Sequence, residues 1–239
     1  MAKHSMSSYK ASMVKKIGHS EEVKFNFFFG NNTLDDLNFS GASEDCIVEK
    51  EDFKSVIKKE LNYNENDFTV SLKSGKTWQF HLGVINEIST LDFIKKNIST
   101  KVLDNGKDLT IVKYSKSFEE QLKVLKSYSF WAKYLKKGSL LCYNEKEHQS
   151  YTFFEMNMVI NSIIKHVKWR ILESGRIKGD CIINNKLCSG VITLEFRNDD
   201  HKQCLVLGSS GGSGKSANGY RLFLFLKEKI KSICIKPLN

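Results

Sequence analysis

Short segments with strand-like alternation recur along this chain, separated by stretches whose apolar residues have helical spacing. Residues 68–72 alternate as a strand, and residues 77–82 resume this character after Gly75. Just before them, residues 52–61 place their apolar side chains on one face of a helix. Strands this short, set among helices, predict an α/β (mixed) fold with a mixed β-sheet flanked by helices, and not a regular βαβ series.

The same patterns predict the other elements. Helices are expected over residues 9–29, with Gly30 as the stop, and over residues 91–97, 118–135 and 153–172. Strands are expected over residues 46–48, 180–183, 191–196, 203–207 and 222–226, with a turn at Asn184 and Asn185.

The amino-acid composition excludes several classes of protein. With 239 residues, 41% hydrophobic and 27% charged, the chain has enough apolar material for one large or two small domains, which excludes disorder, collagen and coiled coil as the whole structure. No apolar run reaches the roughly 18 to 20 residues that cross a bilayer, so no membrane association is expected. Six cysteines occur without a CxxC pair, which predicts reduced thiols in a cytoplasmic protein.

The balance of basic and acidic side chains changes near residue 115. The net charge is +10, but residues 1–115 carry 16 basic and 16 acidic side chains, whereas residues 116–239 carry 21 and 11. All four arginines also lie in the second part. Arginine suits phosphates and guanine edges, so this asymmetry predicts a catalytic region over residues 1–115 and a basic DNA-recognition region over residues 116–239. The alternative is a lysine-rich solvated surface.

Acidic and basic side chains in the first part suggest a hydrolytic site. Glu22 lies on the first expected helix, Asp45 begins a strand, and Ser71 and Lys73 share one face of the next strand because residues two apart do so. Phosphodiester hydrolysis needs a divalent ion held by oxygens and a cation near the attacking water. The alternative is that each is an ordinary surface group.

Three stretches that contain these residues resemble the PD-(D/E)XK nucleases, and among them the type II restriction endonucleases. They are Gly18-His19-Ser20-Glu21-Glu22, Gly41-Ala42-Ser43-Glu44-Asp45 and Ser71-Leu72-Lys73-Ser74-Gly75-Lys76, the last followed by Gln79-Phe80-His81. The order and spacing are similar to those of the small monomeric enzymes that cut four-base GC-rich sites. In those enzymes, too, an uncharged polar residue replaces the usual acid at the position of Ser71.

The resemblance implies Mg²⁺-dependent, sequence-specific cleavage of double-stranded DNA, and a cognate DNA methyltransferase as functional partner. It implies that Asp45 and Glu22 bind the metal, Glu22 through water, and that Lys73 orients or deprotonates the attacking water. Glu21 is the alternative to Glu22. Two other functions remain open: a repair or nicking nuclease on the same scaffold, and a catalytically silent DNA-binding protein, which the neutral Ser71 would suit.

A Gly/Ser-rich tract, residues 208–219, contains Gly214-Lys215-Ser216 after an expected strand. A phosphate-binding P-loop needs a glycine at position 209, where this chain has serine, and a helix where Ala217-Asn218-Gly219 indicates a turn. The tract is therefore expected to contact DNA, because glycines allow close backbone approach. The donors would be Ser213, Lys215, Asn218 and Arg221. The alternative is a flexible linker.

A third group, Asp180 with Glu195 and Arg197, has the same order as the nuclease signature, an acid followed by an acid-x-cation triplet. An arginine stays protonated and cannot act as a base, so these residues are expected on a recognition sheet or in a surface ion pair. Further expected DNA contacts are Gln79, His81, Arg197 and Asn198. A lone strand histidine such as His81 is also commonly structural.

Overall fold

The computed structural model describes the chain in eleven segments: residues 20–31, 46–75, 78–84, 98–102, 108–112, 117–135, 138–145, 150–172, 177–199, 202–209 and 217–237. The chain forms two compact units, each discontinuous in sequence. Unit 1 comprises Met1–Ser74, Lys137–Glu155 and Ser232–Asn239, and unit 2 comprises Gly75–Lys136 and Met156–Lys231. This partition by contacts differs from the expected one by charge, and the catalytic and recognition roles of residues 1–115 and 116–239 stay predictions.

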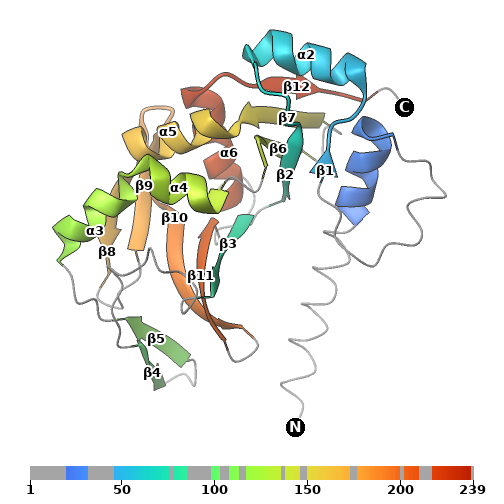
Figure 1. Cartoon of the computed structure of the whole chain (residues 1–239). Helices are drawn as coiled ribbons and strands as arrows, with labels where there is room; N and C mark the ends of the chain where they lie inside the picture. The colour runs from blue at the N-terminus through green and yellow to red at the C-terminus, as the bar shows by residue number, and fades with distance from the viewer. Residues whose placement is uncertain are drawn as a thin grey trace. The chain divides into compact units, whose positions relative to one another are not determined.

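Unit 1 is built on a five-stranded mixed sheet with the order β1-β2-β6-β7-β12 (Figure 1). Its strands are β1 (Cys46–Ile47), β2 (Thr69–Ser74), β6 (Leu140–Glu145), β7 (Ser150–Glu155) and β12 (Ile233–Ile235). β2 and β6 run parallel, and the other neighbours run antiparallel. The parallel pair joins segments that lie far apart along the chain.

Among the described residues, two helices contribute to the core of unit 1: the helix of residues 20–29, here the Phe-rich helix, and α2 (Glu51–Leu61). Phe25 and Phe29 lie one turn apart on the Phe-rich helix and are fully buried. They pack in one cluster with Val70 of β2 and with α2. The Phe-rich helix ends before Gly30, and the ammonium of Lys50 donates to the carbonyls of Phe27 and Phe28 at 3.0 and 2.8 Å, satisfying acceptors that a helix end leaves open.

Polar contacts fasten the start of β2 to the start of β6. The Asp67 carboxylate accepts hydrogen bonds from the Ser139 hydroxyl at 2.6 Å and from the Thr69 N–H at 2.9 Å. Gly138 lies so close to β2 that a Cβ there would be 3.0 Å from the backbone nitrogen of Ser71. A Cβ this close to backbone would force β2 to shift by a few tenths of an ångström, so glycine suits the close approach of residue 138 to β2.

Unit 2 contains a second five-stranded sheet, of order β3-β11-β10-β9-β8, with every neighbouring pair antiparallel. Its strands are β3 (Trp78–Val84), β11 (Lys202–Ser209), β10 (Lys186–Asp199), β9 (Ile177–Ile183) and β8 (Lys168–Ile171). A separate two-stranded sheet joins β4 (Ile98–Val102) and β5 (Asp108–Val112).

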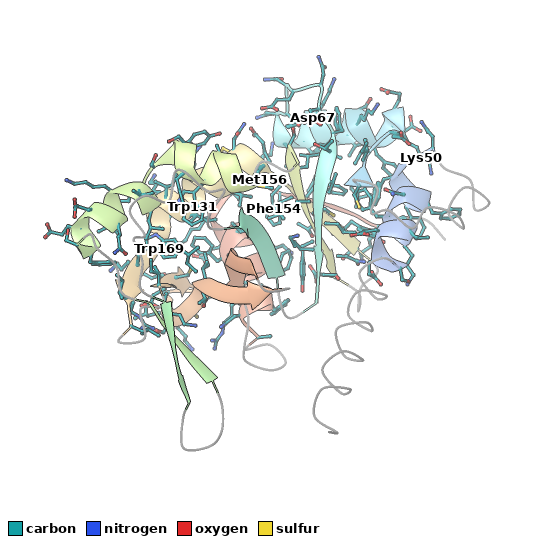
Figure 2. All side chains as sticks on the ribbon, turned by 60° about the horizontal axis from the view of Figure 1, so that its bottom comes forward. Lys50, Asp67, Trp131, Phe154, Met156 and Trp169 are labelled. Carbon is teal, nitrogen blue, oxygen red and sulfur yellow. The ribbon has the colours of Figure 1, made fainter. Side chains whose placement is uncertain are left out.

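The described residues of unit 2 include the helices α3 (Phe118–Leu125), α4 (Tyr128–Leu135), α5 (Met156–His166) and α6 (Asn218–Lys229). α4 contacts α5, and α6 contacts β9, β10 and β11. In Figure 1, α4 and α5 lie together above the strands of this sheet. Figure 2 labels two buried indoles of this unit, Trp131 and Trp169, whose rings stack with centroids 5.7 Å apart.

One face of the second sheet is apolar. On β9 the buried residues alternate with more exposed ones, and the buried set includes Ile177, Cys181 and Ile183. A register row crosses all five strands at apolar residues only: Ile171, Ile177, Leu194, Leu207 and Phe80. This face is therefore the core face of unit 2, and the remaining positions of β9 lie on the opposite face.

Most predicted elements in the described residues are confirmed, and the protein is mixed α/β with a mixed sheet flanked by helices. Two predictions were wrong. Residues 153–172 are not one helix, because residues 150–155 form β7 and 168–171 form β8 on either side of α5. Residues 222–226 lie in α6, since a five-residue apolar run fits a buried helix as well as a strand. The stretch 118–135 is divided at Ser127 into α3 and α4.

Two further predictions concern helices: those expected at residues 91–97 and before residue 20, and the absence of a membrane-spanning helix. The expected helix over residues 91–97, and the part of the first helix before residue 20, lie outside the described residues. None of the described helices combines the length and the apolar character required to cross a bilayer.

Candidate functional site

Ser71 and Lys73 lie on β2, both half-buried. Val70 and Leu72, which alternate with them, pack against the core that the Phe-rich helix and α2 cover. Since successive strand residues point to opposite faces, Ser71 and Lys73 share the other face of the sheet. The predicted pairing of these two residues on one face is confirmed.

β1 is the hydrogen-bonded neighbour of β2. The strands run antiparallel, with Cys46 opposite Val70 and Ile47 opposite Thr69. The first residue of β1, Cys46, therefore lies beside Val70, the residue that precedes Ser71 on β2. Asp45, the residue before Cys46, lies outside the described residues, so its predicted role as metal ligand stays a prediction.

The two helix acids differ in their surroundings. Glu21 is 7% exposed, and its Oε2 accepts a hydrogen bond from Asn144 Nδ2 of β6 at 2.5 Å. Lys24, one turn further on, places its ammonium 3.7 Å from Oε1. Glu22 is half-buried.

The faces of the sheet separate these acids from Lys73. Asn144 lies opposite Ser74 of β2, so Glu21 contacts the face that carries Val70 and Leu72. The structure therefore places the Phe-rich helix, with Glu21 and Glu22, over the opposite face from Ser71 and Lys73. The convergence expected from their order in the sequence is not present in the described residues.

The described residues contain no cluster of three or more His, Cys, Asp or Glu side chains that could hold a metal ion. On the Lys73 face of β2, Ser71 offers one neutral hydroxyl oxygen. Mg²⁺ prefers carboxylate oxygen and water, so a metal at this point needs an acid from elsewhere, and Asp45 is the residue that the prediction assigns to it.

Four of the predicted DNA contacts lie on two strands of the unit 2 sheet. Gln79 and His81 belong to β3, and Arg197 and Asn198 belong to β10, with β11 between the two strands. The charge division had placed Gln79 and His81 with the catalytic residues. The fold instead groups them with Arg197 and Asn198, because Trp78–Val84 pairs with β11.

The remaining predicted contacts lie at the start of α6. Asn218 is the first residue of this helix, and its Nδ2 donates to the carbonyl of Gly190 at 3.2 Å. Arg221 follows on the first turn and is half-buried. Ser213 and Lys215 lie outside the described residues.

The turn expected at residues 217–219 is wrong, because α6 begins there. The chain therefore has a strand, the Gly/Ser tract and a helix in the order that a P-loop has. Other features still argue against nucleotide binding. β11 is antiparallel to both neighbours, whereas a P-loop strand belongs to a parallel sheet. Ser209, at the position of the first P-loop glycine, is buried and its hydroxyl donates to the Val191 carbonyl at 2.7 Å.

Asp180, from the third predicted group, stabilises a β-bulge. The register of β9 and β10 shifts between Cys188 and Ile192, and Gly190 within the shift has a φ of 63°. Asp180 Oδ1 accepts from the Gly190 N–H at 2.6 Å and from the Ser189 hydroxyl at 3.1 Å. Its Oδ2 lies 3.0 Å from Arg170 Nε. Asp180 therefore pairs with Arg170, a residue outside the predicted group, and an ion pair with Arg197 stays a prediction.

These contacts shift the acid equilibrium of Asp180. Burial by itself raises the pKa of this carboxyl, but the hydrogen bonds from Gly190, Arg170 and Ser189 outweigh burial and hold the pKa below its ordinary value. A carboxyl whose pKa is lower in the folded state stabilises the fold above its unfolded pKa. That contribution is lost as the pH falls through the folded pKa.

We therefore expect Asp180→Asn to lower the free energy of unfolding at pH 7 by about 1.5 to 3 kcal/mol, the range for hydrogen bonds to a charged group. The loss should shrink as the pH falls below about 4, near the unfolded pKa of aspartate, because the wild-type carboxylate is then protonated too. Urea unfolding at several pH values measures this. Glu60→Gln, at an exposed position of α2, is the control. A difference between wild type and Asp180→Asn that does not change with pH would contradict the assignment.

The structure also reveals basic residues that the sequence analysis did not select: Lys168, Arg170 and Lys178. Lys168 and Arg170 lay inside the wrongly predicted helix 153–172. Extending the predicted strand 180–183 backwards by three residues would have shown Lys178 and Asp180 on one face.

No protein-family model matches the chain, and neither the characterised proteins nor the solved structures compared with it give a match. The resemblance to the PD-(D/E)XK nucleases therefore depends on the sequence motifs alone.

Proposed function

We propose that this protein is a Mg²⁺-dependent type II restriction endonuclease of the PD-(D/E)XK kind, which hydrolyses double-stranded DNA at Asp45, Ser71 and Lys73. The observation that carries the proposal is the pairing of β1 with β2. The motif requires its aspartate and its lysine on neighbouring strands, and the strand that follows Asp45 directly is the neighbour of the strand that carries Ser71 and Lys73.

The proposal assigns a role to each residue. It requires Asp45 to continue β1 by one residue, opposite Ser71, so that a carboxylate and a hydroxyl offer oxygens to one ion. Lys73, on the same face as Ser71, would hold and help to deprotonate the attacking water. Mg²⁺ bound there would polarise the scissile phosphate and lower the pKa of a bound water. The centre does not need Glu22, because the Phe-rich helix packs on the other face of the sheet.

Unit 2 would supply recognition. The proposed DNA contacts Gln79, His81, Arg197 and Asn198 lie on β3 and β10 of a single sheet. A sheet that presents polar side chains in a fixed register can hold several hydrogen-bonding groups against a duplex, which base-specific reading requires.

Incubation with DNA tests the proposal. We expect purified protein to cut unmethylated, PCR-amplified DNA of known sequence into discrete fragments with Mg²⁺, and to leave it intact with EDTA. Single-strand breaks in a supercoiled plasmid without linear product would indicate the nicking alternative. A mobility shift without cleavage would indicate the silent DNA-binding protein. Absence of both cleavage and binding would refute the nuclease proposal and its alternatives together.

A further inference from the structure

One face of the second sheet gathers positive charge that the proposed catalytic centre does not use. A register row crosses all five strands at Gln79, Gly208, Thr193, Lys178 and Arg170. In the next row Lys168 lies opposite Asp180. These rows lie on the side of β9 opposite the apolar core face. The described residues Lys168, Arg170, Lys178, Asp180, Ser189 and Thr193 are here called the basic face.

Two cations of this face, Arg170 and Lys178, are held by hydrogen bonds. Arg170 donates through Nε to Asp180 and through Nη2 to the Ser189 hydroxyl at 2.8 Å, while its side chain remains 43% exposed. Lys178 donates to the Thr193 hydroxyl at 2.7 Å. Its methylene groups lie over Gly190, where a Cβ would be 3.3 Å from Lys178 Cδ. Side chains fixed in this way lose less conformational entropy when they bind a ligand.

The charge balance favours an anionic partner. Lys168, Arg170 and Lys178 carry three positive charges against the single carboxylate of Asp180, which leaves a formal +2 on the four charged side chains of the basic face. Lys168 is exposed. A guanidinium and two ammonium groups on neighbouring strands of one sheet suit the closely spaced phosphates of a nucleic acid duplex.

We infer that the basic face binds the sugar-phosphate backbone of double-stranded DNA, with Lys168, Arg170 and Lys178 as the phosphate contacts and with Asp180 and Ser189 as positioning residues that orient Arg170. The inference rests on the proposed function in naming duplex DNA as the occupant. It adds phosphate contacts on β8 and β9, strands that carry none of the DNA contacts proposed above.

Binding without cleavage tests the inference. Fluorescence anisotropy with a labelled duplex of mixed sequence, in EDTA, gives the dissociation constant from about 50 to about 200 mM salt. Each lost phosphate contact should lower the log-log salt slope by about 0.9. We expect this decrease for Lys168→Ala, whose side chain is exposed and whose loss should not affect folding, and about twice the decrease for Lys168→Ala combined with Lys178→Met. Lys165→Ala, an exposed lysine of α5 in the same unit, should leave the slope at the wild-type value.

The outcomes separate this inference from the nuclease proposal. The inference would be overturned if the salt slopes of the basic-face variants were unchanged, or if Lys165→Ala lowered the slope equally. Cleavage of DNA by the wild type would still support the nuclease proposal in that case. Reduced slopes in a protein that never cuts DNA would support the basic face and refute the nuclease. A wild type that does not bind the duplex would overturn the inference, and if it also failed to cut DNA with Mg²⁺ the nuclease proposal would fall as well.

Discussion

Replacing Lys73 by alanine should lower the rate of DNA cleavage by about 10²- to 10⁴-fold, the contribution typical of a positioned acid–base group. The expected cause is loss of the ammonium that shares a face of β2 with Ser71 and that the proposal places beside the attacking water. Binding to the same DNA in EDTA should stay within about twofold, because at most one phosphate contact is lost. Fragment formation over time, with protein in excess over DNA, measures the cleavage rate.

A matched lysine provides the control for Lys73. Lys59 is exposed on α2 of the same unit, so Lys59→Ala changes the net charge equally but leaves β2 intact. We expect normal cleavage by this variant. Wild-type turnover in Lys73→Ala, or equal losses in both variants, would refute the proposed centre.

The largest expected effect on stability concerns Trp131, which has no solvent-exposed surface. Its indole nitrogen donates to the Leu125 carbonyl at 2.7 Å, and its ring stacks on Trp169 with an interplanar angle of 17°. Figure 2 shows these two labelled side chains close together. Trp131→Ala should lower the free energy of unfolding by about 3 to 5 kcal/mol, the range for a large aromatic residue removed from a core.

Urea unfolding followed by circular dichroism measures this loss. Trp131→Phe keeps a ring against Trp169 but removes the donor to Leu125, and should destabilise by less than Trp131→Ala. Met158→Ala, at a position of α5 that is 44% exposed, should change the free energy by less than about 0.5 kcal/mol. An effect of Trp131→Ala as small as that of Met158→Ala would show that the indole pair does not support the core of unit 2.

Local patterns predicted the elements whose burial follows a simple period. α2 was predictable because its buried residues Ile57 and Leu61 lie one turn apart on a charged helix. β2 was predictable from the alternation that ends at Gly75, and β9 and β10 from the turn at Asn184 and Asn185, both of which have positive φ.

Apolar runs without a clear period were less informative. Residues 150–155 form β7 because they pair with β6 and β12, and residues 168–171 form β8 because they pair with β9. Residues 222–226 belong to a helix that packs on β9, β10 and β11. In each case pairing or packing with other segments decided the conformation, and local propensity did not.

The candidate site, too, was predictable from the sequence only in part. The spacing of Ser71 and Lys73 already implied a common face, since alternation is a property of any strand. Which acids could join them was not predictable, because the face covered by the Phe-rich helix depends on how Phe25 and Phe29 pack against the sheet. For this reason Glu21 contacts Asn144 instead of meeting Lys73.

The amino-acid sequence by itself determined the mixed α/β class, the periods of the regular elements and the excess of positive charge in the second half, because each follows from residue type and near-neighbour spacing. Only the tertiary structure decided that β1 lies beside β2, that β2 lies beside β6, and that Lys178 and Arg170 stand next to each other over Gly190. These juxtapositions depend on which strands pair and in which register, and the free energy of such pairing belongs to the assembled sheet and not to any one segment.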